Sequence, residues 1–385
     1  MAVAKRSFAL KIGAAAELVL VRPDGSEHAV HPLWLRERCK DAASLDLTSQ
    51  QRLQDPSDFD PQLQLTAVTE PEPGLLRVKF SDGHEGSFSS DELLAEAALA
   101  INSCDCPALR LWDGTLAALP RARWRADPPP AELMSWLEPF LTLGFVILEQ
   151  VPTTPGTVLA VAALFGFTRA TNFGALFDVR STPAAVDLAY SALALPPHTD
   201  NPYRTPVPGV QLLHCLRNET SGGLSMLVDG FAVAEDLRHA LPQAFDILAR
   251  TPVRFRFIEA GSEITASAPL IELDASGAPR AIHFNTRLDY VPLLPPDELD
   301  GYFRARRQLD RRVRSPQFQL SFLLTAGDLV MFDNCRLLHG RTGFDPAQGV
   351  RHLQGCYIDV DGPRSLWRVL RRRLGGVSAD LRRSA

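Results

Sequence analysis

The sequence predicts a mainly β protein with additional helices, organised as a small β-rich domain followed by a larger barrel. Three observations predict it. The chain has 385 residues, 45% of them hydrophobic, which is long for one domain and enough for two cores. The segment Asp127-Pro-Pro-Pro is a stiff breaker about a third of the way along. After residue 208, short apolar strands separated by turns dominate and helical patterns bracket them, as in a double-layered β-barrel.

The first domain is predicted over residues 1–125 and contains two hairpins. Residues 17–22 are mostly apolar and precede Asp24-Gly25, and residues 75–80 precede Asp82-Gly83. Asp-Gly after such a run favours a tight turn, because glycine readily adopts the positive φ that hairpin turns require. The breaker at residues 123–130 then marks a boundary, which leaves residues 126–385 for the second domain.

The second domain is predicted to open with a helix over residues 131–143 and a strand over residues 145–148. A helix follows over residues 155–165 and has proline in its first turn. Apolar runs predict strands at residues 210–216 and 328–333, and helical periodicity predicts helices at residues 232–250 and 297–313. These strands and helices complete the predicted barrel with its outer helices.

Composition argues against several classes of function. A formal net charge of -5 argues against nucleic-acid binding, because phosphate backbones are bound by basic faces. No segment approaches the roughly 20 apolar residues that span a bilayer, and Lys11 interrupts the apolar stretch that a signal peptide would need. We therefore expect a cytoplasmic protein that acts on small molecules, with no nucleic-acid and no membrane partner.

Three separated residues predict a metal site: His198, Asp200 and His339. Alternate residues of a strand point to the same face, so His198 and Asp200 can reach one ion. His339 follows the apolar run at residues 329–332 and supplies a third ligand from another strand. Two imidazoles and a carboxylate hold Fe(II) on one face and leave the opposite face open. Arg351, twelve residues after His339, has a guanidinium suited to bind the far carboxylate of 2-oxoglutarate through paired hydrogen bonds.

The chain resembles the γ-butyrobetaine dioxygenase branch of the Fe(II)/2-oxoglutarate oxygenases, a group related to taurine dioxygenase. The matching segments are residues 198–203, 208–215, 222–225, 228–231, 332–341 and 351–357. The resemblance implies a double-stranded β-helix, or jelly-roll, catalytic domain in a hydroxylase that uses Fe(II), O2 and 2-oxoglutarate. It implies that His198, Asp200 and His339 are the iron ligands and catalytic residues. It also implies that Arg351 binds the C5 carboxylate of 2-oxoglutarate. Ser225 stands where relatives have an assisting hydroxyl, and relatives also imply a homodimer.

The same resemblance implies an aromatic receptor for a trimethylammonium group. Phe173, Phe177, Tyr190 and Tyr357 stand where family members have aromatic residues. The chemistry supports this interpretation, because a quaternary ammonium donates no hydrogen bonds and is bound by the faces of aromatic rings. The alternative from the residues alone is that these four side chains are ordinary core aromatics.

The opposite end of the substrate is predicted to meet Asp187, Asn285 and Arg287. An Arg287–Asp187 pair beside Asn285 would suit a tail more highly charged than a carboxylate, such as a phosphonate. This favours 2-(trimethylammonio)ethylphosphonate slightly over γ-butyrobetaine. Trimethyllysine is an alternative, because Asp187 could bind its α-ammonium and Arg287 its α-carboxylate. A plain surface salt bridge between Arg287 and Asp187 is the remaining interpretation.

Two other functions compete with a hydroxylase. A zinc hydrolase could use the same three ligands, but no glutamate-bearing helix motif lies near them to act as general base. A non-catalytic betaine-binding module would keep the fold, but such a receptor has no use for an open iron face or for Arg351.

The first domain also resembles the N-terminal domain of the family, which often carries structural zinc on three cysteines and a histidine. Cys39 and His84 match two of those positions, whereas Asp41 and Ser44 occupy the other two. Structural zinc requires four good ligands, mostly thiolate or imidazole. The sequence therefore predicts no structural zinc here. We expect the domain to rely on its own packing, and to serve dimerisation or to form a wall over the active site.

Overall fold

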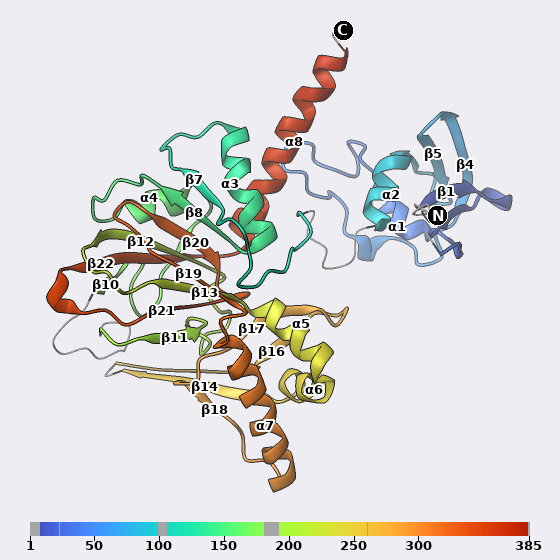
Figure 1. Cartoon of the computed structure of the whole chain (residues 1–385). Coiled ribbons are helices and arrows are strands. Elements are labelled where there is room, and N and C mark those ends of the chain that lie inside the picture. Colours follow the sequence, from blue (N-terminus) through green and yellow to red (C-terminus); the bar gives the residue numbers. More distant parts are fainter. Residues whose placement is uncertain (1–7, 23, 99–105, 181–191, 260, 384–385) are drawn as a thin grey trace, which may run out of the picture. The chain divides into compact units, whose positions relative to one another are not determined.

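The computed structural model describes residues 8–22, 24–98, 106–180, 192–259 and 261–383 and divides the chain into two units, residues 1–104 and 105–385 (Figure 1). This division lies before the boundary expected at residue 125. The reason is backbone pairing: the Arg110 amide donates to the Thr142 carbonyl at 2.9 Å, and strand β7 (Arg121–Arg123) pairs in parallel with β8 (Phe145–Glu149). The segment after residue 105 is therefore part of the larger unit.

The smaller unit contains two three-stranded antiparallel sheets. One is formed by β1 (Ala9–Ile12), β2 (Leu18–Val21) and β3 (Glu27–Ala29), and the other by β4 (Leu65–Glu72), β5 (Leu75–Phe80) and β6 (Glu85–Ser89). The two predicted hairpins are β2–β3 and β5–β6, whose turns contain Gly25 and Gly83 at φ of 88° and 83°. Helices α1 (Pro32–Arg36) and α2 (Ser90–Ala98) complete a small core that includes Leu18, Leu35, Val78 and Phe80.

The larger unit is built on two facing sheets. The larger sheet runs β10 (Phe177–Arg180), β22 (Arg351–Ile358), β12 (Val210–Asn218), β20 (Leu329–Asp333), β8 and β7, with β9 (Thr168–Arg169) beside β22. The smaller sheet runs β11 (Leu195–His198), β21 (Leu337–Arg341), β13 (Ser225–Asp229) and β19 (Gln319–Phe322). Side chains from both sheets, such as Phe332 and Leu353 from one and Phe322 and Leu337 from the other, share one core. This is the β-rich sandwich expected of a jelly roll.

Helices cover the outer faces of both sheets (Figure 1). Helices α3 (Pro130–Leu143), α4 (Thr157–Ala163) and α8 (Asp361–Arg383) pack on the larger sheet. Helices α5 (Gly230–Ala240), α6 (Pro242–Arg250) and α7 (Pro296–Val313) pack with the smaller sheet and with strands β14 (Pro252–Glu259) to β18 (Asp289–Tyr290). The single helix predicted over residues 232–250 is therefore wrong: Leu241 has φ -144°, and Pro242 starts a second helix, because proline fits a first turn but not a helix interior.

A buried ion pair joins the strand of the third predicted ligand to the rest of the unit. The Arg336 guanidinium donates to both carboxylate oxygens of Asp229, at 3.0 and 2.7 Å, and also to the carbonyls of Thr142 and Arg110. Asp229 caps helix α5 by accepting from the Phe231 amide. The Asp229 side chain, at the end of β13, thus both pairs with the Arg336 guanidinium and caps helix α5. Within the described ranges, no helix combines the length and apolar character needed to cross a bilayer.

Candidate active site

One cavity of about 380 Å³ opens into the interior of the two-sheet unit. Strand alternation decides which side chains reach it. On β12, Val210 and Leu212 pack against the outer helices, whereas Gln211 and Leu213 line the cavity. On β22, Arg351, Leu353 and Tyr357 do the same. The cavity is also lined by Phe173, Phe177, His198, Asp200, Tyr203, Ser225, Phe257, Asn285, Arg287, Leu288, His339 and Arg341.

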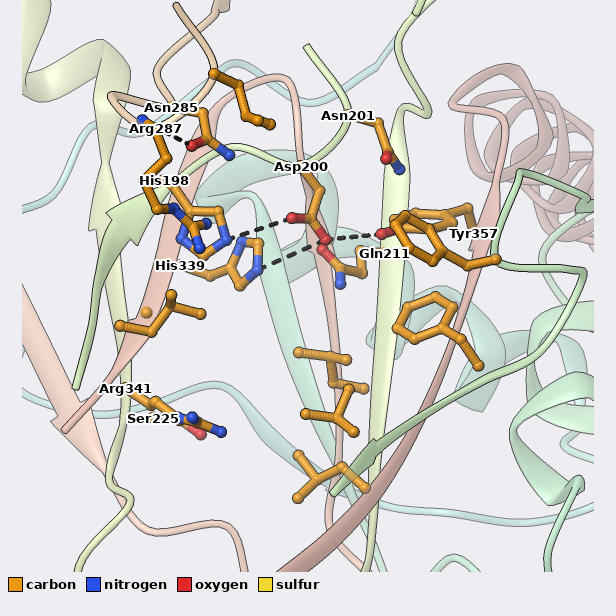
Figure 2. Close-up of a pocket in the computed structure, with 18 of the residues that line it drawn as sticks. His198, Asp200, Asn201, Gln211, Ser225, Asn285, Arg287, His339, Arg341 and Tyr357 are labelled. Atoms are coloured by element: carbon orange, nitrogen blue, oxygen red, sulfur yellow. Dashed lines mark hydrogen bonds and ion pairs between the residues drawn. The ribbon is translucent and has the colours of Figure 1, made fainter. Parts of the chain in front are cut away.

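His198, Asp200 and His339 meet at the centre of this cavity (Figure 2). His198 ends β11, and its Cα pairs in register with that of His339 in β21. Their ring centroids lie 4.4 Å apart. The Asp200 carboxylate faces both rings, with Oδ1 3.3 Å from His198 Nε2 and Oδ2 3.8 Å from His339 Nε2. All three donor atoms lie within 4.8 Å of one another, so two strands far apart in sequence converge on one point.

Neighbouring groups fix the orientation of these donors. His198 Nδ1 lies 2.9 Å from the Pro196 carbonyl, which leaves Nε2 to face Asp200. Asn334, fully buried, accepts from the Asp200 amide at 2.8 Å and donates to the Asp200 carbonyl at 3.0 Å. A backbone clamp of this kind holds Asp200 to the turn between β20 and β21. In the sequence, Asn334 lies within the matching segment 332–341, but no pattern there assigned it a role.

The protonation states suit a metal. Burial and the adjacent His198 lower the pKa of His339 to about 3, so its imidazole is neutral near pH 7. Burial opposes ionisation of Asp200, yet the facing His339 and His198 hold the pKa of this carboxyl below its ordinary value. Two imidazoles and one carboxylate, beside an open cavity, are the donor set that Fe(II) takes in oxygenases. The residues therefore fit the iron that the sequence predicted.

A pair of buried arginines lines the same cavity. Arg351 is 6% exposed, and its Nε has no hydrogen-bond partner. Among the residues that the structure describes, no carboxylate lies within ion-pair distance of Arg351. Burial, and then the charge of Arg351, lowers the pKa of Arg341 to about 10. Ser225 pairs in register with Arg341 across β13 and β21. This end of the cavity therefore carries two buried guanidiniums, one from each sheet.

The cavity has an aromatic wall. The Phe177 ring lies 5.2 Å from that of Tyr357 and 6.5 Å from that of Phe173. Tyr190, the fourth predicted ring, lies in residues 181–191, outside the described residues. Sequence reasoning missed Phe257, which lies 5.7 Å from Phe173 in an edge-on arrangement. Nothing in the alternation of β14 distinguishes Phe257 from a core residue, so the sequence held no signal for it.

The predicted tail residues are partly observed. Asn285 and Arg287 both line the cavity, and the Arg287 amide donates to the Asn285 side chain at 3.3 Å. The Arg287 charge is also one cause of the lowered pKa of His339, which follows from its nearness to that ring. Asp187 lies among residues 181–191, so the Arg287–Asp187 pair falls outside the described part of the chain.

A second cluster of metal-ligand residue types lies in the smaller unit. Cys39 Sγ and one donor atom each of Asp41 and His84 lie within 4.8 Å of one another. His84 Nε2 is already paired with Asp41 Oδ2 at 2.9 Å. Ser44, at the remaining zinc-ligand position, accepts a hydrogen bond from Arg36 instead. Of the described residues, three rather than four offer donors, which does not fit a closed zinc site. The absence of zinc stays a prediction.

Comparison with known proteins agrees with this geometry. The family described as "Taurine catabolism dioxygenase TauD, TfdA family" matches residues 124–357, and "Gamma-butyrobetaine hydroxylase-like, N-terminal" matches residues 14–94. The chain is 38% identical to a gamma-butyrobetaine dioxygenase of Pseudomonas sp. (strain AK-1), over 91% of this chain and 92% of the relative. It is 28% identical to a mitochondrial trimethyllysine dioxygenase of Bos taurus, over 88% and 82% of the two chains.

A solved structure supports the fold. A taurine dioxygenase from Burkholderia xenovorans superposes with a TM-score of 0.50 at 16% identity, covering 66% of this chain and 94% of that one.

Proposed function

This chain belongs to the TauD, TfdA dioxygenase family, and from that premise we propose that it is an Fe(II)- and 2-oxoglutarate-dependent hydroxylase of a small trimethylammonium zwitterion. One observation carries the proposal: the aromatic wall and the His198–Asp200–His339 cluster line a single cavity. Relatives named for γ-butyrobetaine and trimethyllysine are consistent with an onium substrate.

Each part of the cavity has a distinct task in the reaction. Bound iron, with O2, supplies oxidative decarboxylation of 2-oxoglutarate to succinate and CO2 and transfer of one oxygen atom to a substrate C–H bond. His198, Asp200 and His339 would hold the iron. Arg351, buried and without a carboxylate partner among the described residues, binds the far carboxylate of 2-oxoglutarate, and Ser225 lines the same end. The apolar walls exclude water, so that oxidation is directed at the bound substrate.

The cationic end of the substrate faces the rings of Phe173, Phe177 and Tyr357. A trimethylammonium group carries a diffuse charge without a donor proton, and each desolvated ring face contributes about 0.5–2 kcal/mol to its binding. Tyr190 is the proposed fourth wall. The neighbouring Asp200, His198 and His339 then lie beside the methylene chain rather than beside the ammonium itself.

The anionic end faces Asn285 and Arg287. A guanidinium binds tetrahedral oxyanions strongly, because several charge-assisted hydrogen bonds form at once. The nearness of Arg287 to His339 supports a tail contact close to the iron, so we propose 2-(trimethylammonio)ethylphosphonate ahead of γ-butyrobetaine. Trimethyllysine is the further candidate.

Substrate-dependent succinate release decides among these compounds. The purified enzyme is supplied with Fe(II), 2-oxoglutarate and O2, and each of the three candidates is compared at equal concentration. We expect the highest kcat/KM with the phosphonate; much faster turnover of γ-butyrobetaine would refute the choice of tail. Failure of all three compounds, despite O2-dependent succinate formation without substrate, would refute the onium class.

Arg287→Ala tests the tail directly. We expect kcat/KM for the phosphonate to fall by about 10- to 100-fold, since a charge-assisted hydrogen-bonded contact is worth about 1.5–3 kcal/mol. Phosphonate turnover that is unaffected by the substitution would exclude Arg287 from tail binding.

A further inference from the structure

Tyr357 touches two parts of the active site at once. Its ring lies 5.2 Å from Phe177 in the aromatic wall, and its hydroxyl donates to Asp200 Oδ2 at 2.7 Å. Figure 2 shows the Tyr357 hydroxyl directed at the Asp200 carboxylate. A side chain needed only as an aromatic surface has no use for this hydrogen bond.

The position of Tyr357 is fixed by its surroundings. Only 2% of the residue is exposed. On β22 it pairs in register with Gln211 of β12, and on its other side with Arg169 of β9. A hydroxyl on an interior strand of the larger sheet, paired on both sides, is preorganised, so little freedom is lost when it binds Asp200.

We propose that Tyr357 is a positioning residue for the iron ligand Asp200, and that it thereby links the onium wall to the metal site. The link to cation binding rests on the proposed function, whereas the positioning of Asp200 by the Tyr357 hydroxyl does not. With Oδ2 held by the phenol, Oδ1, which faces His198 Nε2 at 3.3 Å, remains as the donor for the metal.

Loss of the hydroxyl has a chemical consequence. A carboxylate without an outer hydrogen bond can rotate and offer both oxygens to a metal. It would then occupy a coordination position that the co-substrate or O2 needs. Partners that orient a metal ligand in this way typically affect metal affinity or activity by about 10–100-fold. The hydroxyl should therefore matter for metal binding and for coupling of succinate formation to hydroxylation, and not for binding of the cation.

Three variants separate these roles. Tyr357→Phe keeps the ring and removes the hydroxyl, Phe177→Leu removes a wall ring and leaves the hydroxyl, and Tyr357→Leu removes both. Metal affinity is measured anaerobically by titration with Mn(II) followed by electron paramagnetic resonance. Cation binding is measured by competition with tetramethylammonium, and coupling by the ratio of succinate to hydroxylated product.

We expect Tyr357→Phe to weaken Mn(II) binding by about 10-fold and to raise the succinate-to-product ratio, with tetramethylammonium competition unchanged. Phe177→Leu should weaken tetramethylammonium competition and leave Mn(II) binding and the succinate-to-product ratio unchanged. Tyr357→Leu should show both defects. Parental Mn(II) affinity and coupling in Tyr357→Phe would overturn the inference. The Mn(II) titration needs no substrate, so its result is independent of whether the onium proposal holds.

A second inference comes from the smaller unit, where one guanidinium ties three segments together. Arg36 is 4% exposed. Its Nε donates to Asp82 Oδ2 at 3.1 Å, Nη1 to Ser44 Oγ at 3.1 Å and Nη2 to Gln54 Oε1 at 3.0 Å. The guanidinium also lies over the Phe59 ring, 4.8 Å from its centroid.

We infer that Arg36 organises this part of the domain in place of the structural zinc that the family resemblance implies. The group is a fixed cation near Cys39, and its hydrogen bonds join segments around residues 44, 54 and 82. Burial also raises the pKa of the Cys39 thiol to about 11, which disfavours the thiolate that zinc requires. A second cation in this cluster would be repelled by the first.

Metal analysis tests this inference in the full chain. In a His339→Ala background, which disables the iron site, we expect no stoichiometric zinc after growth in zinc-supplemented medium and dialysis. The unfolding temperature should not change when a chelator is added. One zinc per chain, or a chelator-dependent loss of stability, would overturn the inference. The matched gain-of-site variant combines Asp41→Cys, Ser44→Cys and Arg36→Gln, and it should acquire zinc, whereas the same two cysteines with Arg36 retained should not.

Discussion

The two units each hold a cluster of histidine, aspartate and a third metal-binding side chain, yet they differ in what surrounds the donors. In the larger unit, His198, Asp200 and His339 face a cavity that other buried polar groups also line. In the smaller unit, Asp41 and His84 bind each other beside a buried guanidinium. Ligand residue types alone therefore do not define a metal site: the donors must also face a cavity that can hold an ion and its remaining ligands.

Backbone geometry produces this difference. His198 and His339 stand on paired strands whose register sets their spacing, and Asn334 clamps the backbone of Asp200. The scaffold places the Asp200 carboxylate 3.3 Å from His198 Nε2 and 3.8 Å from His339 Nε2, and both distances are longer than an ordinary hydrogen bond. In the other cluster the His84–Asp41 distance of 2.9 Å is that of a completed hydrogen bond.

The largest expected effect comes from exchanging one histidine in each cluster for alanine. His339→Ala should lower O2-dependent turnover by more than about 100-fold, because loss of a ligand exceeds the effect of losing its outer partners. His84→Ala should change neither iron content nor turnover. Iron per chain and succinate release are the measurements. A His84→Ala enzyme that loses its iron would contradict the contrast between the clusters.

The next effect concerns the stability of the smaller unit. Arg36→Met should lower the free energy of unfolding by about 1–3 kcal/mol, since it removes the donor of the buried Ser44 hydroxyl and breaks the hydrogen bonds to Asp82 and Gln54. Denaturant unfolding, followed by the fluorescence of the chain, measures the loss. Arg38→Met is the control, because Arg38 is more exposed and pairs with the exposed Glu96. Equal effects of the two substitutions would show that Arg36 is not the organising cation.

A smaller effect on iron affinity is expected where β11 and β21, the strands that carry His198 and His339, approach each other. A Cβ on Gly340 would lie 2.6 Å from the Leu195 carbonyl oxygen and 3.0 Å from the Pro197 nitrogen. Gly340→Ala must therefore push β21 away from β11 and change the spacing of His198 and His339. We expect iron affinity to fall by about 10-fold, measured by anaerobic metal titration. Unchanged affinity would show that strand spacing does not control the site.

The smallest effect should be confined to the aromatic wall. A Cβ on Gly355 would lie 2.5 Å from two carbons of the Phe177 ring. Gly355→Ala should displace that ring and weaken tetramethylammonium competition by about fivefold, within the range of one cation–π contact. Metal affinity should stay at the parental value. Weaker metal binding with unchanged tetramethylammonium competition would contradict the assignment of Phe177 to the cation-binding wall.

Several features of the molecule could be predicted from the sequence because their signal is local. The strand at residues 210–216, the helix at residues 297–313 and the turns at Gly25 and Gly83 depend on periodicity and on glycine conformation. The His-x-Asp spacing likewise predicts two donors on one face. The sequence did not reveal the break at Pro242 or the pairing that takes residues 106–125 into the larger unit.

The chemical identities of His198, Asp200, His339 and Arg351 were determined by the sequence, since a donor type is a property of one residue. Only the tertiary structure decided which groups orient them. Asn334 lies 134 residues from Asp200, and Tyr357 lies 157 residues from it. Such contacts are set by the pairing of distant strands, whose register depends on the whole core and is encoded at no single position. The same reason explains why one histidine–aspartate cluster faces an open cavity while the other is closed by its own His84–Asp41 hydrogen bond.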